Sequence, residues 1–212
     1  VGQVRDVLEK IQTGEPIIVD GTNAQVFIRP GEEVCQRYIN SARVRAERKA
    51  AYAQLHNLES VTKDGAHISL NINAGLLIDM QNLKDKGIDG VGLYRTEVPF
   101  MTRSDFPDVI DQCEIYKKVF ELSDQKPVIF RTLDVGGDKI LPYWSTQNEE
   151  NPAMGWRAIR VSLDRPMILR QQLRALIQSA VDRELNIMFP MIAEVPEFDQ
   201  ASSLLKRELK RQ

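Results

Sequence analysis

The fold class of this chain is decided by the stretch Val128-Ile129-Phe130-Arg131-Thr132-Leu133-Asp134. Its apolar beginning is short, rich in β-branched and aromatic residues, and ends at an arginine, which predicts a buried strand. Helical patterns precede it at residues 105–122 and follow it at residues 166–183. A strand between two helices is the repeating unit of a parallel sheet.

The same alternation continues on both sides of this stretch. We expect further strands at residues 68–72, 90–93 and 187–191, and further helices at residues 76–86 and from residue 196 onward. Strand and helix therefore alternate four times. This pattern implies parallel strands with right-handed crossovers, which means either a doubly wound sheet or part of a (β/α)8 barrel.

The first 60 residues follow a different pattern. Residues 17–28 contain two β-rich runs around a turn with Asp20, Gly21 and Asn23, which predicts a hairpin. Residues 33–58 contain neither Gly nor Pro and predict a long polar helix, which we interpret as a connector between domains. Its basic residues 43–49 are interleaved with acidic charge and lack aromatic neighbours, so a solvated helix face is favoured over nucleic-acid binding.

The composition of the chain is that of a soluble globular protein. Among its 212 residues, 28 basic and 30 acidic side chains are mixed along the sequence, so no global field favours nucleic acid or an anionic membrane. Cys35 and Cys113 form no disulfide or zinc motif, which fits a reducing cytoplasm. No apolar stretch approaches the roughly 20 residues of a membrane span. Because the sequence begins without methionine and ends on a charged helical pattern, we interpret it as a piece of a longer protein.

Arginines stand at or just after the ends of several apolar runs. Arg95 ends the strand at residues 90–93, and Glu97 is placed to orient it, although a surface Arg–Glu pair of little energetic value explains the same residues. Arg131 follows a buried strand and needs a partner, which is either Asp134 or a ligand. The carboxyl ends of parallel strands meet at one edge, so these guanidinium groups are expected to converge into a site for a phosphate or carboxylate.

Two later segments extend this expected site. Residues 136–139 combine two glycines, which permit a tight turn and close approach to a ligand, with the cation of Lys139. Arg157 and Arg160 lie at the expected start of a helix, where backbone N–H groups also favour anions, although a helix-stabilising role explains Arg160 equally well. The remaining arginines of the helix at residues 166–183 and its start are interpreted as its solvated face: Arg165, Arg170, Arg174 and Arg183.

The sequence offers no nucleophile or metal centre of its own. His56 and His67 lack the surroundings of an activated imidazole, and neither cysteine has the neighbours of a reactive thiol. The acidic pair at residues 149–150 is interpreted as an exposed loop charge. We therefore assign no catalytic residue and no metal ligand in this chain.

Taken together, these motifs resemble the phosphoenolpyruvate-utilising family, and within it the enzyme I branch of the phosphotransferase systems. The resemblance covers nearly the whole chain and is carried by residues 90–97, 131–139, 150–152, 155–160 and 187–191. Residues 98–101 are more similar to the nitrogen-regulatory paralogue than to the sugar-transport enzyme. Pyruvate phosphate dikinase and phosphoenolpyruvate synthase are relatives in the same class and remain an alternative.

The resemblance implies a domain organisation. Residues 1–34 would be the tail of a swivelling phosphohistidine domain, and residues 35–62 a linker helix. Residues 63–212 would form the first half of a phosphoenolpyruvate-binding (β/α)8 barrel. Half a barrel leaves strand edges and an apolar interior uncovered, so we expect a homodimer or larger oligomer.

The resemblance also implies a reaction, in which the phosphoryl group of phosphoenolpyruvate moves to an enzyme histidine and then to a histidine-containing phosphocarrier protein, with Mg2+ at the barrel. It implies phosphoenolpyruvate binding by Arg95, Arg131 and Arg157, with Lys139 and Asp134 in second rank. The phosphorylated histidine and the Mg2+ ligands have no match here, so we expect both outside this chain and no turnover by the chain alone. A non-catalytic regulatory or interaction module is the alternative from another class.

Overall fold

The computed structural model describes residues 7–53, 58–84, 87–101, 103–136, 139, 141, 151 and 155–211. The chain divides into two units, residues 1–57 and residues 58–212, each with its own internal contacts. None of the helices in the described ranges is long and apolar enough to cross a membrane.

The first unit contains the predicted hairpin and the predicted long helix. Its elements are α1 (Val7–Lys10), β1 (Ile17–Asp20), β2 (Gln25–Ile28) and α2 (Glu32–Ala53). The strands β1 and β2 pair antiparallel, as expected. Asp20 holds the turn, because its carboxylate accepts hydrogen bonds from the backbone N–H groups of Thr22 at 2.9 Å and Asn23 at 3.2 Å.

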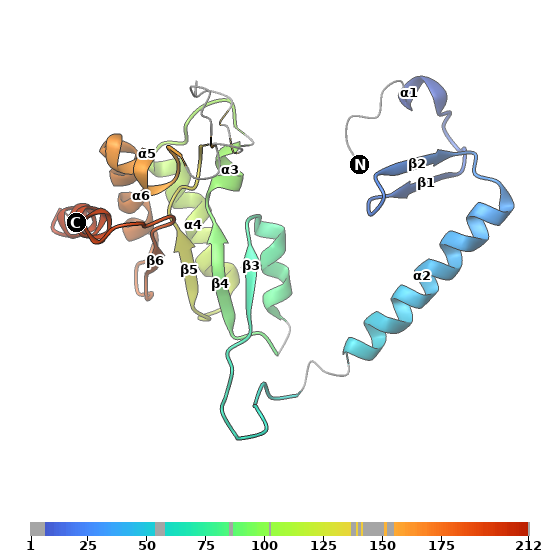
Figure 1. The fold of residues 1–212 in the computed structure, drawn as a ribbon, viewed down its shortest axis with the longest axis horizontal. Helices are drawn as coiled ribbons and strands as arrows, with labels where there is room; N and C mark the ends of the chain where they lie inside the picture. The colour runs from blue at the N-terminus through green and yellow to red at the C-terminus, as the bar shows by residue number, and fades with distance from the viewer. Residues whose placement is uncertain are drawn as a thin grey trace. The chain divides into compact units, whose positions relative to one another are not determined.

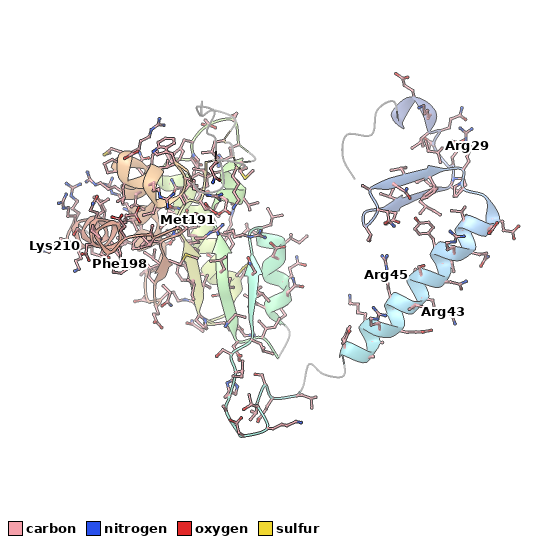
Figure 2. The ribbon with its side chains drawn as sticks, viewed as in Figure 1. Arg29, Arg43, Arg45, Met191, Phe198 and Lys210 are labelled. Carbon is pink, nitrogen blue, oxygen red and sulfur yellow. The ribbon has the colours of Figure 1, made fainter. Side chains whose placement is uncertain are left out.

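The helix α2 is attached to the hairpin near its beginning and is exposed from Ile39 onward. The Tyr38 hydroxyl donates to Asp20 Oδ2 at 2.7 Å, and the rings of Tyr38 and Phe27 pack with centroids 5.5 Å apart. No residue of α2 is buried. Arg43 and Arg45 project away from the helix axis (Figure 2). The basic stretch therefore lies on an exposed helix face, as interpreted from the sequence.

The second unit is an α/β structure built on a parallel four-stranded sheet. Its elements are β3 (Asn71–Ala74), the 3-10 helix η2 (Leu77–Lys84), β4 (Gly90–Arg95), α3 (Glu97–Met101), α4 (Val109–Ser123), β5 (Val128–Arg131), α5 (Ile159–Asp164), α6 (Pro166–Ser179), β6 (Asn186–Met188) and α7 (Val195–Leu209). Figure 1 shows β3, β4, β5 and β6 side by side in this order, and all three pairings are parallel. This confirms the predicted alternation and is consistent with a partial α/β barrel.

The helices form one layer that follows the order of the strands. η2 packs on α4, α4 packs on α6, and α6 packs on α7. Between this layer and the sheet lies an apolar core centred on Phe130, whose ring centroid is 5.1–5.6 Å from those of Tyr94, Tyr116 and Phe120. Aromatic contacts at these distances add to the stabilisation from burial.

The opposite face of the sheet is less covered by the described residues. Side chains alternate across a strand, so the residues between the core positions point to this face. They include Asn71 and Asn73 of β3 and Ile129 of β5, all exposed. This alternation explains why β3 reads as polar in sequence although it is part of the sheet.

Several predicted boundaries differ from the structure. The first strand of the sheet is Asn71–Ala74 and not residues 68–72, because the Leu70 N–H donates to the Asp89 side chain at 2.7 Å instead of joining a ladder. The helix expected from residue 105 begins after Pro107, where the Asp108 side chain accepts from the Asp111 N–H at 2.8 Å and caps it.

The other differences concern short elements and helix ends. The helix α3 was not predicted, since five residues hold too little periodicity to recognise, whereas α5 begins close to the helix start expected at Arg157 and Arg160. α6 ends at Ser179, before the predicted residue 183, and β6 spans Asn186–Met188, so it begins one residue before the predicted strand at residues 187–191 and ends three residues earlier. Residues 54–57, 85 and 86, at the predicted ends of two helices, lie outside the described residues.

Candidate functional site

Arg95 and Arg131 occupy neighbouring positions at the carboxyl edge of the sheet. Each is the last residue of its strand, and they are direct partners in the pairing of β4 with β5. The preceding partners, Tyr94 and Phe130, are fully buried toward the helices. Because side chains alternate, both arginines leave the sheet on the face away from the helices.

The guanidinium of Arg131 is held by two carboxylates. Its Nη2 pairs with Glu97 Oε1 and lies 3.3 Å from Asp134 Oδ2. Both carboxylate side chains are nearly fully buried, at 2% and 6% exposed, while the Arg131 side chain is 14% exposed. The alternative partner Asp134 named from the sequence is therefore present. Glu97 was expected to orient Arg95, but its hydrogen bonds go to other residues.

Lys139 and Arg157 complete the same ion-pair network. Lys139 Nζ lies 2.9 Å from Glu97 Oε1 and 3.0 Å from Asp134 Oδ2, and Arg157 Nη2 lies 2.9 Å from Asp134 Oδ1. Among the described residues, three cations thus share two carboxylates. We call these five residues the carboxyl-edge cluster: Glu97, Arg131, Asp134, Lys139 and Arg157.

The cluster keeps Asp134 ionised. Burial alone would raise the pKa of this carboxyl, but the hydrogen bonds from Arg157 and Lys139, with the positive charges of Lys139 and Arg131, hold its pKa below the ordinary value. A buried carboxylate with these partners is a fixed negative group that orients cations.

Gly136 allows Arg157 to reach the cluster. Its φ of +115° is one that other residues rarely adopt, and a Cβ there would lie 2.6 Å from the Trp156 carbonyl oxygen and 2.8 Å from Arg157 Cβ. The Ala158 N–H then donates to the Val135 carbonyl at 2.9 Å. The glycine therefore permits close approach of another segment of the chain. Gly137 and Asp138 of the same motif lie outside the described residues.

Arg95 is placed differently from the other two predicted arginines. Its side chain is exposed and leans over the loop after β3, since a Cβ on Gly75 would lie 3.5 Å from Arg95 Nε and 3.6 Å from Nη2. Backbone hydrogen bonds from Gly75 and Leu76, helped by the charge of Arg95, lower the pKa of Asp79 in this loop. Among the described residues, the structure gives Arg95 no hydrogen bond or ion pair.

Two buried polar atoms of the cluster have no hydrogen-bond partner in the part of the chain that the structure describes. Glu97 Oε2 and Arg131 Nε are both buried and unsatisfied, and so is the hydroxyl of the adjacent Thr132. Most buried polar atoms in folded proteins are satisfied, so such atoms indicate a place for a further polar group. Within the described residues, the cluster therefore combines three cations with unused hydrogen-bonding capacity.

Arg160, Arg170 and Arg174 lie outside the carboxyl-edge cluster. Arg160 donates to the Gly155 carbonyl at 2.8 Å and faces Glu197 of α7 at 3.8 Å, which is a helix-stabilising position. Arg170 and Arg174 were expected on a solvated face, but both pair with Glu208, at 2.6 Å and 2.8 Å. Glu208 belongs to α7 and is fully buried. Arg170 and Arg174 lie 38 and 34 residues away from it in sequence, and Arg211 adds a local pair at 3.6 Å, so the interhelical pairs could not be identified from a local pattern.

The described residues contain no group of three or more His, Cys, Asp or Glu side chains that could hold a metal ion. At the carboxyl-edge cluster, the carboxylates of Glu97 and Asp134 are already engaged by cations. These residues do not fit a Mg2+ site. His56 and residues 149–150 lie outside the described ranges.

Comparison with known proteins identifies the family. Residues 49–212 match the family described as "PEP-utilising enzyme, PEP-binding domain", where PEP is phosphoenolpyruvate. The chain therefore belongs to the phosphoenolpyruvate-utilising enzymes, as the resemblance in sequence implied.

Curated relatives carry the name phosphoenolpyruvate-protein phosphotransferase. The chain is 45% identical to that of Priestia megaterium and 43% identical to that of Staphylococcus carnosus (strain TM300), each over 96% of this chain and 36% of the relative. It is also 43% identical to that of Bacillus subtilis (strain 168), over 93% of this chain and 35% of the relative. The chain thus spans little more than a third of the length of these relatives.

Proposed function

We propose that the carboxyl edge of the sheet binds the phosphoryl group of phosphoenolpyruvate, through Arg95, Arg131 and Arg157. Lys139 adds a further cation, and Asp134 orients the groups around it. The observation that carries the proposal is the buried Nε of Arg131, which has no hydrogen-bond partner among the described residues and lies beside the cations of Lys139 and Arg157. An arginine fork with a free donor suits a phosphate oxygen.

The geometry supports a positioning role in phosphoryl transfer. In such reactions a protein mainly holds the reactants in place and neutralises the oxygens of the transferred group. Glu97 and Asp134 fix the Arg131 guanidinium before any ligand arrives, which lowers the cost of ordering it on binding. The exposed side chain of Arg95 stands at the neighbouring strand end, available to close over a bound anion.

We further propose that the chain is part of a phosphoenolpyruvate-protein phosphotransferase. That enzyme would pass the phosphoryl group to one of its own histidines and on to a histidine-containing phosphocarrier protein. The names and identities of the relatives support this assignment. Residues 98–101 favour the nitrogen-regulatory branch. We propose that the Mg2+ ligands are residues outside this chain.

The finer domain assignment is also a proposal. Residues 1–34 would end a swivelling phosphohistidine domain, residues 35–62 would link it, and residues 63–212 would form the first half of a barrel. The order of strands and helices supports the barrel assignment, as does the sheet face that the described residues cover little. The same face supports association into a homodimer or oligomer.

Calorimetric titration of phosphoenolpyruvate into the chain tests the binding site. Inorganic phosphate should bind at the same site and pyruvate should not, if the phosphoryl group is the part recognised. Arg131→Ala should weaken binding by roughly a hundredfold, because a charge-assisted fork contributes about 1.5–3 kcal/mol and its loss also leaves Glu97 and Asp134 with one cation fewer.

Arg170→Ala is the matched control for this experiment. It also removes an arginine that pairs with a buried carboxylate, but its partner Glu208 lies between α6 and α7. The control should bind phosphoenolpyruvate as the wild type does. Equal affinity of wild type and Arg131→Ala, or tight binding of pyruvate, would refute the assignment.

A further inference from the structure

A buried glutamine connects the loops that carry the proposed site. Gln172 of α6 is 1% exposed, and its Nε2 donates to the Thr96 hydroxyl at 2.9 Å and to the Tyr116 hydroxyl at 3.1 Å. Its Oε1 accepts from the Leu133 backbone N–H at 2.9 Å. Both donors and one acceptor position of this side-chain amide are therefore used.

The partners of Gln172 are next to the residues of the carboxyl-edge cluster. Thr96 lies between Arg95 and Glu97 and, through its hydroxyl, donates to the Arg131 carbonyl at 2.8 Å. Leu133 directly precedes Asp134. One side chain thus holds the segment after β4 and the segment after β5 at a fixed separation.

Packing alone does not account for a glutamine at this position. Its neighbours on the same helix, Leu169, Leu173 and Leu176, are fully buried and apolar. A buried side-chain amide destabilises the fold unless it is hydrogen-bonded. When a hydrogen-bonded pair is replaced by two apolar side chains of similar shape, the stability often changes little, so packing does not require a glutamine here. The hydrogen bonds of Gln172 join it to the segments that follow β4 and β5, at Thr96 and Leu133, and to Tyr116 of α4.

We infer that Gln172 is a positioning residue for the proposed phosphoryl site, an inference that rests on the function proposed above. It sets the spacing between the strand ends that carry Arg95 and Arg131, and with it the geometry of Glu97 and Asp134. A site that positions a phosphoryl group is sensitive to displacements of about 1 Å.

Calorimetric titration with phosphoenolpyruvate tests this role, because it reports the Kd and the fraction of binding-competent chain separately. In Gln172→Met, which preserves volume and removes all three hydrogen bonds, the Kd should rise by roughly tenfold to a hundredfold. Thr96→Val removes the link to the Arg131 carbonyl and should act in the same direction. A purely structural role would lower the competent fraction and leave the Kd unchanged.

Gln112→Met is the matched control. Gln112 is also fully buried, but it donates to the Pro107 carbonyl at 2.8 Å and accepts from the Tyr116 hydroxyl at 3.4 Å. Among the described residues it has no hydrogen bond to the segments that follow β4 and β5. It should lose stability and retain the wild-type Kd.

The outcomes are distinguishable. A wild-type Kd in both Gln172→Met and Thr96→Val overturns the positioning role while the proposed function stands. A flat titration of the wild type itself overturns the proposed function and the inference with it. If Gln172→Met does not fold, Thr96→Val decides the question by the same comparison.

Discussion

Neutralising Asp134 is a direct test of the carboxyl-edge cluster. The Asp134→Asn substitution keeps the shape of the side chain and removes its charge. Asp134 lies 2.9 Å from Arg157, 3.0 Å from Lys139 and 3.3 Å from Arg131, and only 6% of its side chain is exposed. Removing one partner of a buried ion pair costs about 3–5 kcal/mol, because a charge is left uncompensated.

The expected loss lies at the lower end of this range. The three cations retain 11–27% of their side-chain exposure, so water compensates part of their charge. We expect a loss of roughly 3 kcal/mol in the free energy of unfolding. For a domain of this size that loss corresponds to a fall in Tm of about 6–12 °C. Thermal unfolding followed by circular dichroism measures it.

Asp111→Asn is the matched control for this measurement. Asp111 also pairs with an arginine, Arg103 at 2.9 Å, but both side chains are more than a third exposed. Exposed pairs contribute about 0–1 kcal/mol, so the control should change the stability little. Equal stability losses in the two variants would refute the view that Asp134 organises the cluster.

The pH dependence of the same variant gives a second measurement. The pKa of folded Asp134 lies below its ordinary value of 3.8, so its stabilising effect is present above about pH 4 and is lost as the pH falls through the folded value. The stability difference between wild type and Asp134→Asn should therefore shrink in acid. A difference that stays constant from neutral pH to below pH 3 would contradict this reasoning.

Further predictions concern other parts of the chain. Tyr38→Phe should raise the pKa of Asp20 from about 2 toward 3.8 in an NMR titration, because the Tyr38 hydrogen bond is the main cause of the shift; an unchanged pKa would exclude this cause. Glu208→Gln should lower the unfolding free energy by roughly 3 kcal/mol in urea denaturation, since Arg170 and Arg174 lose a buried partner; a loss below about 1 kcal/mol would show that the pairing is dispensable. Light scattering at high concentration should show association through the uncovered sheet face, and a monomer would count against it. Incubation with phosphoenolpyruvate and Mg2+ should leave the chain unphosphorylated, and a phosphorylated chain in mass spectrometry would contradict the expected absence of a nucleophile.

Local sequence patterns predicted most of the elements well. The strand Val128–Arg131 was expected at its observed bounds, and the hairpin at residues 17–28 was confirmed. These elements depend on side-chain periodicity and on turn residues such as Asp20, which act over a few residues. The predictions were less accurate for β3, because half of its side chains face an exposed side of the sheet and are polar.

The candidate site was only partly predictable. The residue types and their position at strand ends pointed to Arg131, Asp134 and Lys139, which do share one network. Glu97 was expected to pair with Arg95, and this was wrong. Glu97 begins α3 and pairs with Arg131 on the next strand. A charged side chain can pair with a residue near it in sequence or with one on the adjacent strand. The sequence alone does not show which of the two residues is closer in space.

By itself, then, the amino-acid sequence determined the alternation of strand and helix and the family. It also placed the arginines at the strand ends. Only the tertiary structure decided which charges meet. Gln172 contacts residues 39 and 76 positions away, and Glu208 contacts Arg170 and Arg174. Such contacts depend on how helices pack against a twisted sheet, a geometry that arises only when distant segments bury their apolar faces together.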